Sequence, residues 1–121
     1  MIWLFIGAVA GAIAVALGAF GAHGLKDRIS AEFLAIFETG VRYQMYHALA
    51  LVALGLLARH GTAGWWLTVA GVLFVAGIVI FSGCLYVMAF TGARRLGAIV
   101  PLGGLCFILG WVALAIITLP I

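Results

Sequence analysis

Long apolar segments separated by short polar ones dominate the pattern of this chain. Four segments contain no Asp, Glu, Lys or Arg, at residues 2–22, 43–58, 65–90 and 99–119. A helix needs about 20 apolar residues to cross a hydrocarbon core about 30 Å thick. Such a helix satisfies its own backbone hydrogen bonds in lipid. The pattern predicts an all-α integral membrane four-helix bundle, a single transmembrane domain over residues 1–121.

The polar stretch between the first two segments has a helical pattern of its own. Residues 30–42 separate apolar and polar side chains onto two faces, and Ser30 is a typical N-cap. We expect a short amphipathic helix that either lies at the membrane interface or extends the second spanning helix. Gly40 is the expected bend.

The first segment has an alternative interpretation as a secretory signal peptide, with a weak cleavage site at residues 19–21. However, no basic residue precedes its apolar run, and residues 2–22 are longer than the 7–15 apolar residues usual in signal peptides. We therefore expect a membrane helix here.

Composition and charge narrow the class of protein. Of the 121 residues, 68% are hydrophobic and 7% are charged, against roughly 25% charged in soluble domains. The net charge of +3 does not indicate nucleic acid as a partner, because in a membrane protein Lys and Arg chiefly set the orientation. We expect membrane lipids as partners.

Basic residues gather at one end of the predicted bundle. Five of the six lie before the second or the fourth segment: Lys26, Arg28, Arg42, Arg94 and Arg95. Only Arg59 lies in the middle connection. The positive-inside rule then predicts that residues 23–42 and 91–98 are cytoplasmic and that both termini are outside. Lys26, Arg28, Arg94 and Arg95 are candidates for contact with lipid headgroups.

Small residues recur at helical spacing along three of the predicted helices. They are Gly7, Gly11, Ala14, Gly18 and Gly21 in the first, Ala70, Gly77 and Cys84 in the third, and Cys106, Gly110 and Ala113 in the fourth. Helices in lipid associate through close contact of small residues. We therefore expect the small residues to pack the four helices into a tight bundle. Alternatively, they form the interface of a homo-oligomer or the contact with a partner membrane protein. The two cysteines are expected to be small packing residues.

Polar side chains suited to binding lie between His23 and His47. The binding or proton-linked candidates are His23, Glu38, Arg42, Tyr43, Gln44 and His47. Residues four apart on a helix are neighbours, so Glu38 should pair with Arg42, and Tyr43 should lie beside His47. Gln44 and His47 share a face with Gly40, which would direct an amide and an imidazole toward one neighbour.

The two histidines each have more than one interpretation. His47 would lie about 7 to 8 Å inside the level of Arg42. At such depth, one interpretation is that His47 is neutral and hydrogen-bonded to a carbonyl or to Gln44. The other is that His47 has a proton-linked or ligand-binding role. His23 would cap carbonyls at the end of the first helix or contact a lipid phosphate. A haem held by both histidines is a further alternative.

No motif in the sequence indicates catalysis. The chain has no nucleophile elbow, no phosphate loop and no HExxH sequence. We therefore expect no enzyme, no metal site and no cofactor.

Four strings resemble a known family. They are GAFGAHGL at residues 18–25, ETGVRYQMYHAL at 38–49, FSGCLY at 81–86 and PLGG at 101–104. Together they resemble the YgdD/YwdK-like family of small bacterial inner-membrane proteins, which has animal relatives and is classed as a domain of unknown function. The resemblance covers nearly the whole chain. It implies a multi-pass fold and the bacterial inner membrane as the location, but no activity.

The resemblance also implies which polar positions are typical of the family. They fall on His23, Tyr43, Gln44, His47, Ser82 and Tyr86. Relatives often have Ser where Cys84 stands and Thr where Val100 stands. These departures indicate that position 84 requires a small side chain rather than a hydroxyl.

Three functions are compatible with these observations. The leading hypothesis is a non-enzymatic membrane protein whose cytoplasmic-side polar cluster binds a lipid headgroup, a small ligand or a partner helix. The second is a small transporter or proton-coupled carrier, oligomeric, with Glu38 and His47 as titrating groups. The third is a membrane scaffold or assembly subunit, for which the small residues suffice.

Overall fold

A computed structural model describes residues 1–120 as helices joined by short connections. The α-helices are α1 (Ile2–Phe20), α2 (Ala31–Arg59), α3 (Trp65–Gly77), α4 (Gly83–Thr91) and α5 (Val100–Ile117). The π-helical turn Gly21–Leu25 extends α1, the π-helical turn Ile78–Ser82 joins α3 to α4, and the 3-10 turn Arg94–Ala98 precedes α5. Four continuous rods result, each long and apolar enough to cross a membrane. The prediction of an all-α membrane bundle of four spanning helices is confirmed.

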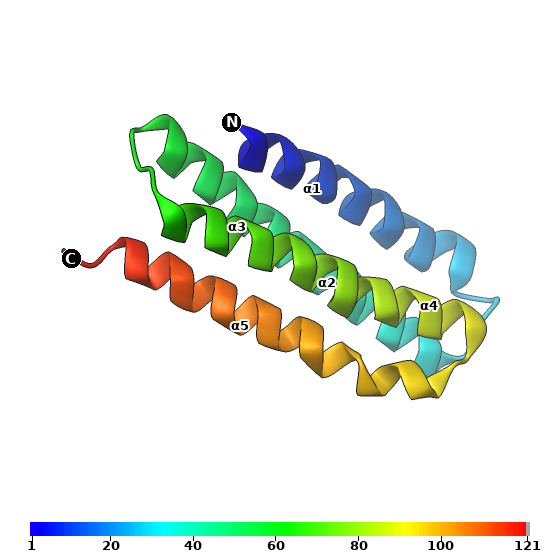
Figure 1. Ribbon diagram of the computed structural model, residues 1–121. Coiled ribbons are helices and arrows are strands. Elements are labelled where there is room, and N and C mark those ends of the chain that lie inside the picture. Colours follow the sequence, from blue (N-terminus) through cyan, green and yellow to red (C-terminus); the bar gives the residue numbers. More distant parts are fainter. Residues whose placement is uncertain (121) are drawn as a thin grey trace.

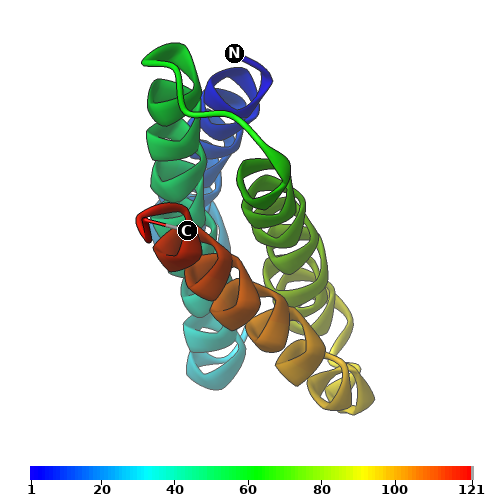
Figure 2. The ribbon, with the colours of Figure 1, turned by 60° about the vertical axis from the view of Figure 1, so that its left-hand side comes forward.

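The rods run alternately up and down the bundle (Figure 1). Both termini and the connection between α2 and α3 lie at one end, and the other two connections lie at the opposite end. The rod of α3 and α4 lies beside α2 in the middle of the molecule, while α1 and α5 lie on opposite sides of that pair (Figures 1 and 2).

The amphipathic segment extends α2, which is the second of its two predicted arrangements. Ser30 caps the helix, because its Oγ accepts a hydrogen bond from the Phe33 N–H at 3.2 Å. The helix continues without interruption through Gly40, where a bend was expected. Close packing explains this glycine instead, since a Cβ there would lie 2.8 Å from Cε1 of Tyr86.

Small residues let the helices approach closely within the chain. A Cβ on Gly7 of α1 would lie 2.7 Å from the backbone oxygen of Ala48 on α2, and one on Gly55 of α2 would lie 2.5 Å from the backbone nitrogen of Leu4. Of the predicted stripe in the first helix, Gly7, Ala14 and Gly21 are buried. The stripe therefore packs against α2, as the interpretation of a tight bundle required.

The central core lies between α2, α3 and α5. Its buried members are Ala50, Leu51, Leu54, Leu67, Ala70, Phe74, Phe107 and Ala113. Phenyl rings occupy the space that glycines leave on the facing helix, with Phe107 of α5 against Gly77 and Phe74 of α3 against Gly110. Cys84 and Cys106 are both half-buried free thiols. This packing holds α5 against α2 and α3 and so positions the site described next.

Candidate functional site

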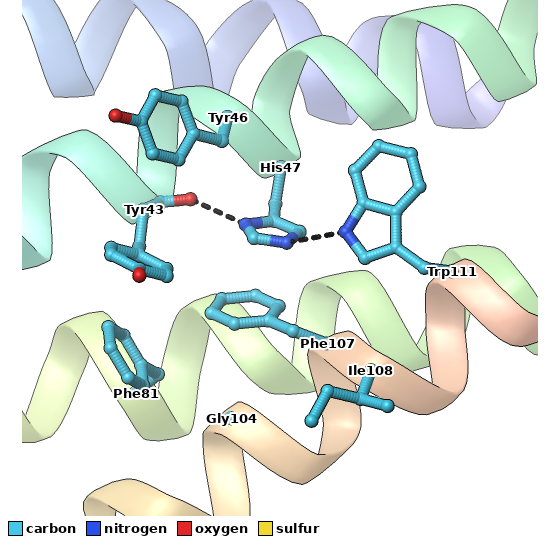
Figure 3. Close-up of a pocket in the computed structure, with 8 residues that line it drawn as sticks. All are labelled: Tyr43, Tyr46, His47, Phe81, Gly104, Phe107, Ile108 and Trp111. Atoms are coloured by element: carbon cyan, nitrogen blue, oxygen red, sulfur yellow. Dashed lines mark hydrogen bonds between the residues drawn. The ribbon is translucent and has the colours of Figure 1, made fainter.

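The candidate site is centred on His47, which lies in α2 and is 4% exposed. Its Nδ1 lies 2.7 Å from the backbone oxygen of Tyr43, one turn earlier on the same helix. On the other side of the ring, Nε1 of Trp111 on α5 lies 3.0 Å from Nε2 (Figure 3). Both ring nitrogens are therefore engaged.

These two hydrogen bonds fix the protonation state of the His47 ring. The Tyr43 carbonyl can only accept a hydrogen bond, and the indole N–H of Trp111 can only donate one. Nδ1 must therefore carry the proton, and Nε2 must be the bare acceptor. A second proton on Nε2 would face the indole N–H, so the arrangement holds the neutral imidazole. This outcome matches the reading of His47 as neutral and bonded to a carbonyl, although Gln44 is not its partner.

Aromatic rings enclose the imidazole. The Phe107 ring stacks on it, with ring centroids 3.5 Å apart and an angle of 8° between the planes. Phe74 and Trp111 complete the enclosure, with centroids 5.6 Å and 5.9 Å from that of His47. The rings of Tyr43 and His47 also lie beside each other, 6.3 Å apart, as their spacing predicted.

A pocket of about 590 Å³ opens beside this cluster, between α2, α5 and the π-helical turn Ile78–Ser82. Its lining is almost entirely apolar and aromatic: Tyr43, Tyr46, His47, Phe81, Gly104, Phe107, Ile108 and Trp111 (Figure 3). Tyr46 and Ile108 are 52% and 61% exposed at its rim. Because the outer surface of a spanning bundle meets lipid, the pocket opens toward the hydrocarbon of the bilayer. We call it the aromatic pocket.

Gln44 points away from this pocket and links three helices. Its Nε2 donates to the backbone oxygen of Ala10 on α1 at 2.8 Å, and its Oε1 accepts from the Tyr86 hydroxyl on α4 at 2.6 Å. Gln44 and His47 therefore serve different neighbours, contrary to the prediction of a common one. The reason is that α2 has a neighbouring helix on each side.

Ser82 supplies a further link between α2 and the rod of α3 and α4. It is fully buried, and its Oγ donates to the backbone oxygen of Gly40 at 2.7 Å. Within residues 1–120, every buried polar side-chain atom has a partner. Ser82 and Tyr86, which only the family resemblance indicated, thus act as interhelical hydrogen-bond donors.

The predicted polar cluster does not assemble around His47. His23 and Glu38 are exposed, whereas Gln44 and His47 are buried. Glu38 and Arg42 form no salt bridge in the described part of the chain, and Arg42 instead donates to Oγ1 of Thr39 at 3.5 Å. An exposed pair of this kind gains only about 0.2 to 0.5 kcal/mol, so a nearby hydroxyl competes with it.

His23 also lies far from His47 along the bundle. No hydrogen bond from His23 to a helix-end carbonyl is found among the described residues, so the expected cap is not formed. Gly21, in the same π-helical turn, packs against Phe37, which precedes His47 by about 15 Å of helix. Two histidines so far apart cannot be the axial ligands of one haem, and this alternative is set aside.

The salt bridge that does form joins the start of α2 to the turn before α5. Arg94 holds Glu32 through two hydrogen bonds of 2.6 Å and 3.2 Å, and its guanidinium lies 5.1 Å from the centre of the Phe33 ring. This pair could not be predicted from the sequence, because the spacing of residues along one helix does not show which charged residue of another segment lies beside them. Lys26, Arg28 and Arg95 are exposed at the same end.

Trp111 and Phe107 are members of the site that were not predicted from the sequence. Both belong to an apolar segment that offers no polar signal, and the helical register that turns them toward His47 comes from packing. A tryptophan in the middle of a spanning segment was the available clue, because the indole N–H needs a partner when water is absent.

These features define a polytopic α-helical membrane protein with a lipid-facing aromatic pocket. Residues 17–104 match the family described as "Protein of unknown function (DUF423)". The chain belongs to this family, in agreement with the resemblance found in the sequence.

Curated relatives extend the similarity to nearly the whole chain. A UPF0382 membrane protein of Staphylococcus epidermidis is 48% identical over 118 residues, covering 98% of this chain and 95% of the relative. The UPF0382 membrane protein YwdK of Bacillus subtilis is 45% identical over 115 residues, covering 95% and 94%. These relatives support a bacterial membrane as the location. No solved structure matches the chain.

Proposed function

We propose that this chain is a non-enzymatic membrane protein that binds the hydrocarbon chain of an amphiphile in the aromatic pocket. The proposal depends on the pocket itself, which has an apolar and aromatic lining and lies on the lipid-facing side of α2 and α5. Ligand pockets are mostly apolar, with few polar groups. Here His47 is engaged by Tyr43 and Trp111, so inside the pocket shape and aromatic contact, rather than free polar groups, hold the hydrocarbon chain.

The rigidity of the lining supports binding rather than transport. His47 is fixed by its two hydrogen bonds and by the stacked Phe107 ring. Glu38, the other residue considered for proton coupling, is exposed. A proton-coupled carrier would use both groups along a polar path, whereas the described interior pairs its own polar atoms.

A photoreactive lipid tests the proposal. Phosphatidylcholine with a diazirine on one acyl chain, in vesicles containing the protein, should crosslink to α2 and α5 residues of the aromatic pocket. Gly104→Leu should fill the pocket and abolish these crosslinks. A Cβ at Gly104 is accommodated, because its nearest neighbour would be a Phe81 ring atom at 4.0 Å.

Gly83→Leu is the matched control. A Cβ at Gly83 meets nothing within 4 Å, and Gly83 does not line the aromatic pocket. This variant should retain the wild-type crosslinks. Crosslinks spread evenly over the outer faces of all four rods, or unchanged in Gly104→Leu, would refute binding in the pocket.

The proposal includes the location and orientation of the chain. We place it in the bacterial inner membrane with both termini outside. Support comes from the charge distribution: the connections at the end opposite the termini carry most of the basic residues (Figure 1). Basic connections stay in the cytoplasm during insertion.

A further inference from the structure

Arg42 lies on α2 one helical turn before Tyr46, a lining residue of the aromatic pocket, on the side nearer the basic end of the bundle. It precedes Tyr46 by four residues on α2, so the two side chains share one face about 6 Å apart along the helix. Tyr46 lines the pocket. A molecule that leaves the pocket along this face toward the basic end therefore meets the Arg42 side chain next.

The Arg42 guanidinium is available to a ligand. The side chain is exposed, and its one polar contact in residues 1–120 is the 3.5 Å hydrogen bond to Thr39. Arg94 differs, because Glu32 neutralises it. Arg42 is thus a cation next to the pocket without a carboxylate bonded to it in the described structure.

Arg42 also lies at the depth of the lipid headgroups. The next charged residue along α2 is Arg59, seventeen positions further. That separation corresponds to about 26 Å of helix, close to the hydrocarbon thickness of about 30 Å. When Arg59 lies at one surface of the hydrocarbon, Arg42 reaches the other, where long basic side chains extend to the interface.

From these three observations we infer that the occupant of the aromatic pocket is an anionic phospholipid, with one acyl chain in the pocket and its headgroup on Arg42. This inference rests on the proposed function and adds the class of ligand. Charge complementarity favours an anionic over a zwitterionic headgroup, because five basic residues against three acidic ones leave this end of the bundle with a net positive charge. Arginine also suits phosphate, since its planar guanidinium can donate two parallel hydrogen bonds.

Competition between two photoreactive lipids tests the inference. Vesicles contain the full chain with equal amounts of phosphatidylglycerol and phosphatidylcholine, each with the diazirine at the same acyl position and a distinguishable mass. Wild-type protein should crosslink phosphatidylglycerol about fivefold more in the pocket, the effect of one basic side chain near an anionic surface. Arg42→Gln should reduce this ratio to about one, with total crosslinking retained.

Arg95→Gln serves as the control for charge. Arg95 is exposed at the same end of the bundle but belongs to the turn Arg94–Ala98 rather than to the pocket rim. The ratio should stay at its wild-type value in this variant. An equal fall in Arg95→Gln and Arg42→Gln would overturn the inference, because diffuse charge would then explain the preference.

Gly104→Leu separates failure of the inference from failure of the proposed function. If both lipids crosslink equally in the wild type and Gly104→Leu removes both, the pocket binds acyl chains but the headgroup assignment is wrong. If Gly104→Leu removes neither, the pocket is not the binding site, and the inference fails with the proposed function.

Discussion

The hydrogen bond between Trp111 and His47 has consequences at the scale of single residues. It joins α5 to α2 inside the hydrocarbon region, where neither group can find water as a substitute. It also requires a bare Nε2 on the imidazole. The pair therefore couples the position of one helix to the tautomer of a side chain on another.

Trp111→Phe should show this coupling. The change removes the indole N–H but keeps an aromatic ring, so Nε2 of His47 loses its donor. Interhelical hydrogen bonds in membranes contribute about 0.6 kcal/mol on average, and we expect a loss of unfolding free energy of that order. Nitrogen-15 spectra of labelled histidine should show the Nδ1–H tautomer in the wild type and a shifted Nε2 resonance in the variant. A wild-type Nε2–H tautomer would contradict the assignment.

At the same scale, the sequence predicted one side-chain contact of the site within a helix but none between helices. The proximity of Tyr43 to His47 follows from their spacing on a single helix, and this prediction agrees with the structure. The partners on other helices do not follow, because they depend on how each rod is rotated. The pairing of Trp111 with His47 and of Glu32 with Arg94 is seen only in the three-dimensional structure.

At the scale of elements, the close backbone contact between α1 and α2 determines which glycines can be replaced by a larger residue. Gly7→Ala would bring a methyl group within 2.7 Å of the Ala48 backbone oxygen. Overpacking of this kind costs about 1 to 3 kcal/mol, and we expect a loss of that size in unfolding titrations with a denaturing detergent. Gly83→Ala, which meets open space, should be neutral or slightly stabilising. Equal behaviour of the two variants would show that α1 does not approach α2 as described.

The π-helical turn Ile78–Ser82 shapes the site at the same scale. Such turns inside longer helices are frequent at functional sites. Phe81 from this turn lines the aromatic pocket, while the adjacent Ser82 bonds to Gly40. One turn thus serves both the pocket and the helix contact. The sequence pattern predicted a single uninterrupted helix here, because hydrophobic spacing does not distinguish a local π turn within an apolar run.

For the whole molecule, the proposed orientation can be tested with two single-cysteine variants. In a background with Cys84 and Cys106 replaced by Ser, Thr62→Cys lies in the connection between α2 and α3, and Asp27→Cys lies in the connection between α1 and α2. A membrane-impermeant maleimide added to intact spheroplasts should label position 62 and should label position 27 only after lysis. The reverse pattern would overturn the proposed orientation.

The overall architecture was the most predictable part of the molecule. Runs of about 20 uncharged apolar residues leave the backbone few alternatives to spanning helices, and four such rods are present. The extent of α2 was less predictable, because its first turns carry Glu32 and other polar residues yet continue the same helix. A helix that extends beyond the hydrocarbon and a separate helix that lies along the membrane surface have the same amphipathic sequence pattern.

The contact between Trp111 and the pocket gives this protein an intrinsic optical reporter. The chain has four tryptophans, and of these Trp111 alone lines the aromatic pocket. Indole emission depends on the immediate surroundings of the ring. In a variant with Trp3, Trp65 and Trp66 replaced by Phe, a lipid carrying bromine atoms or a spin label on its acyl chain would quench Trp111 on entering the pocket, so occupancy can be followed by fluorescence.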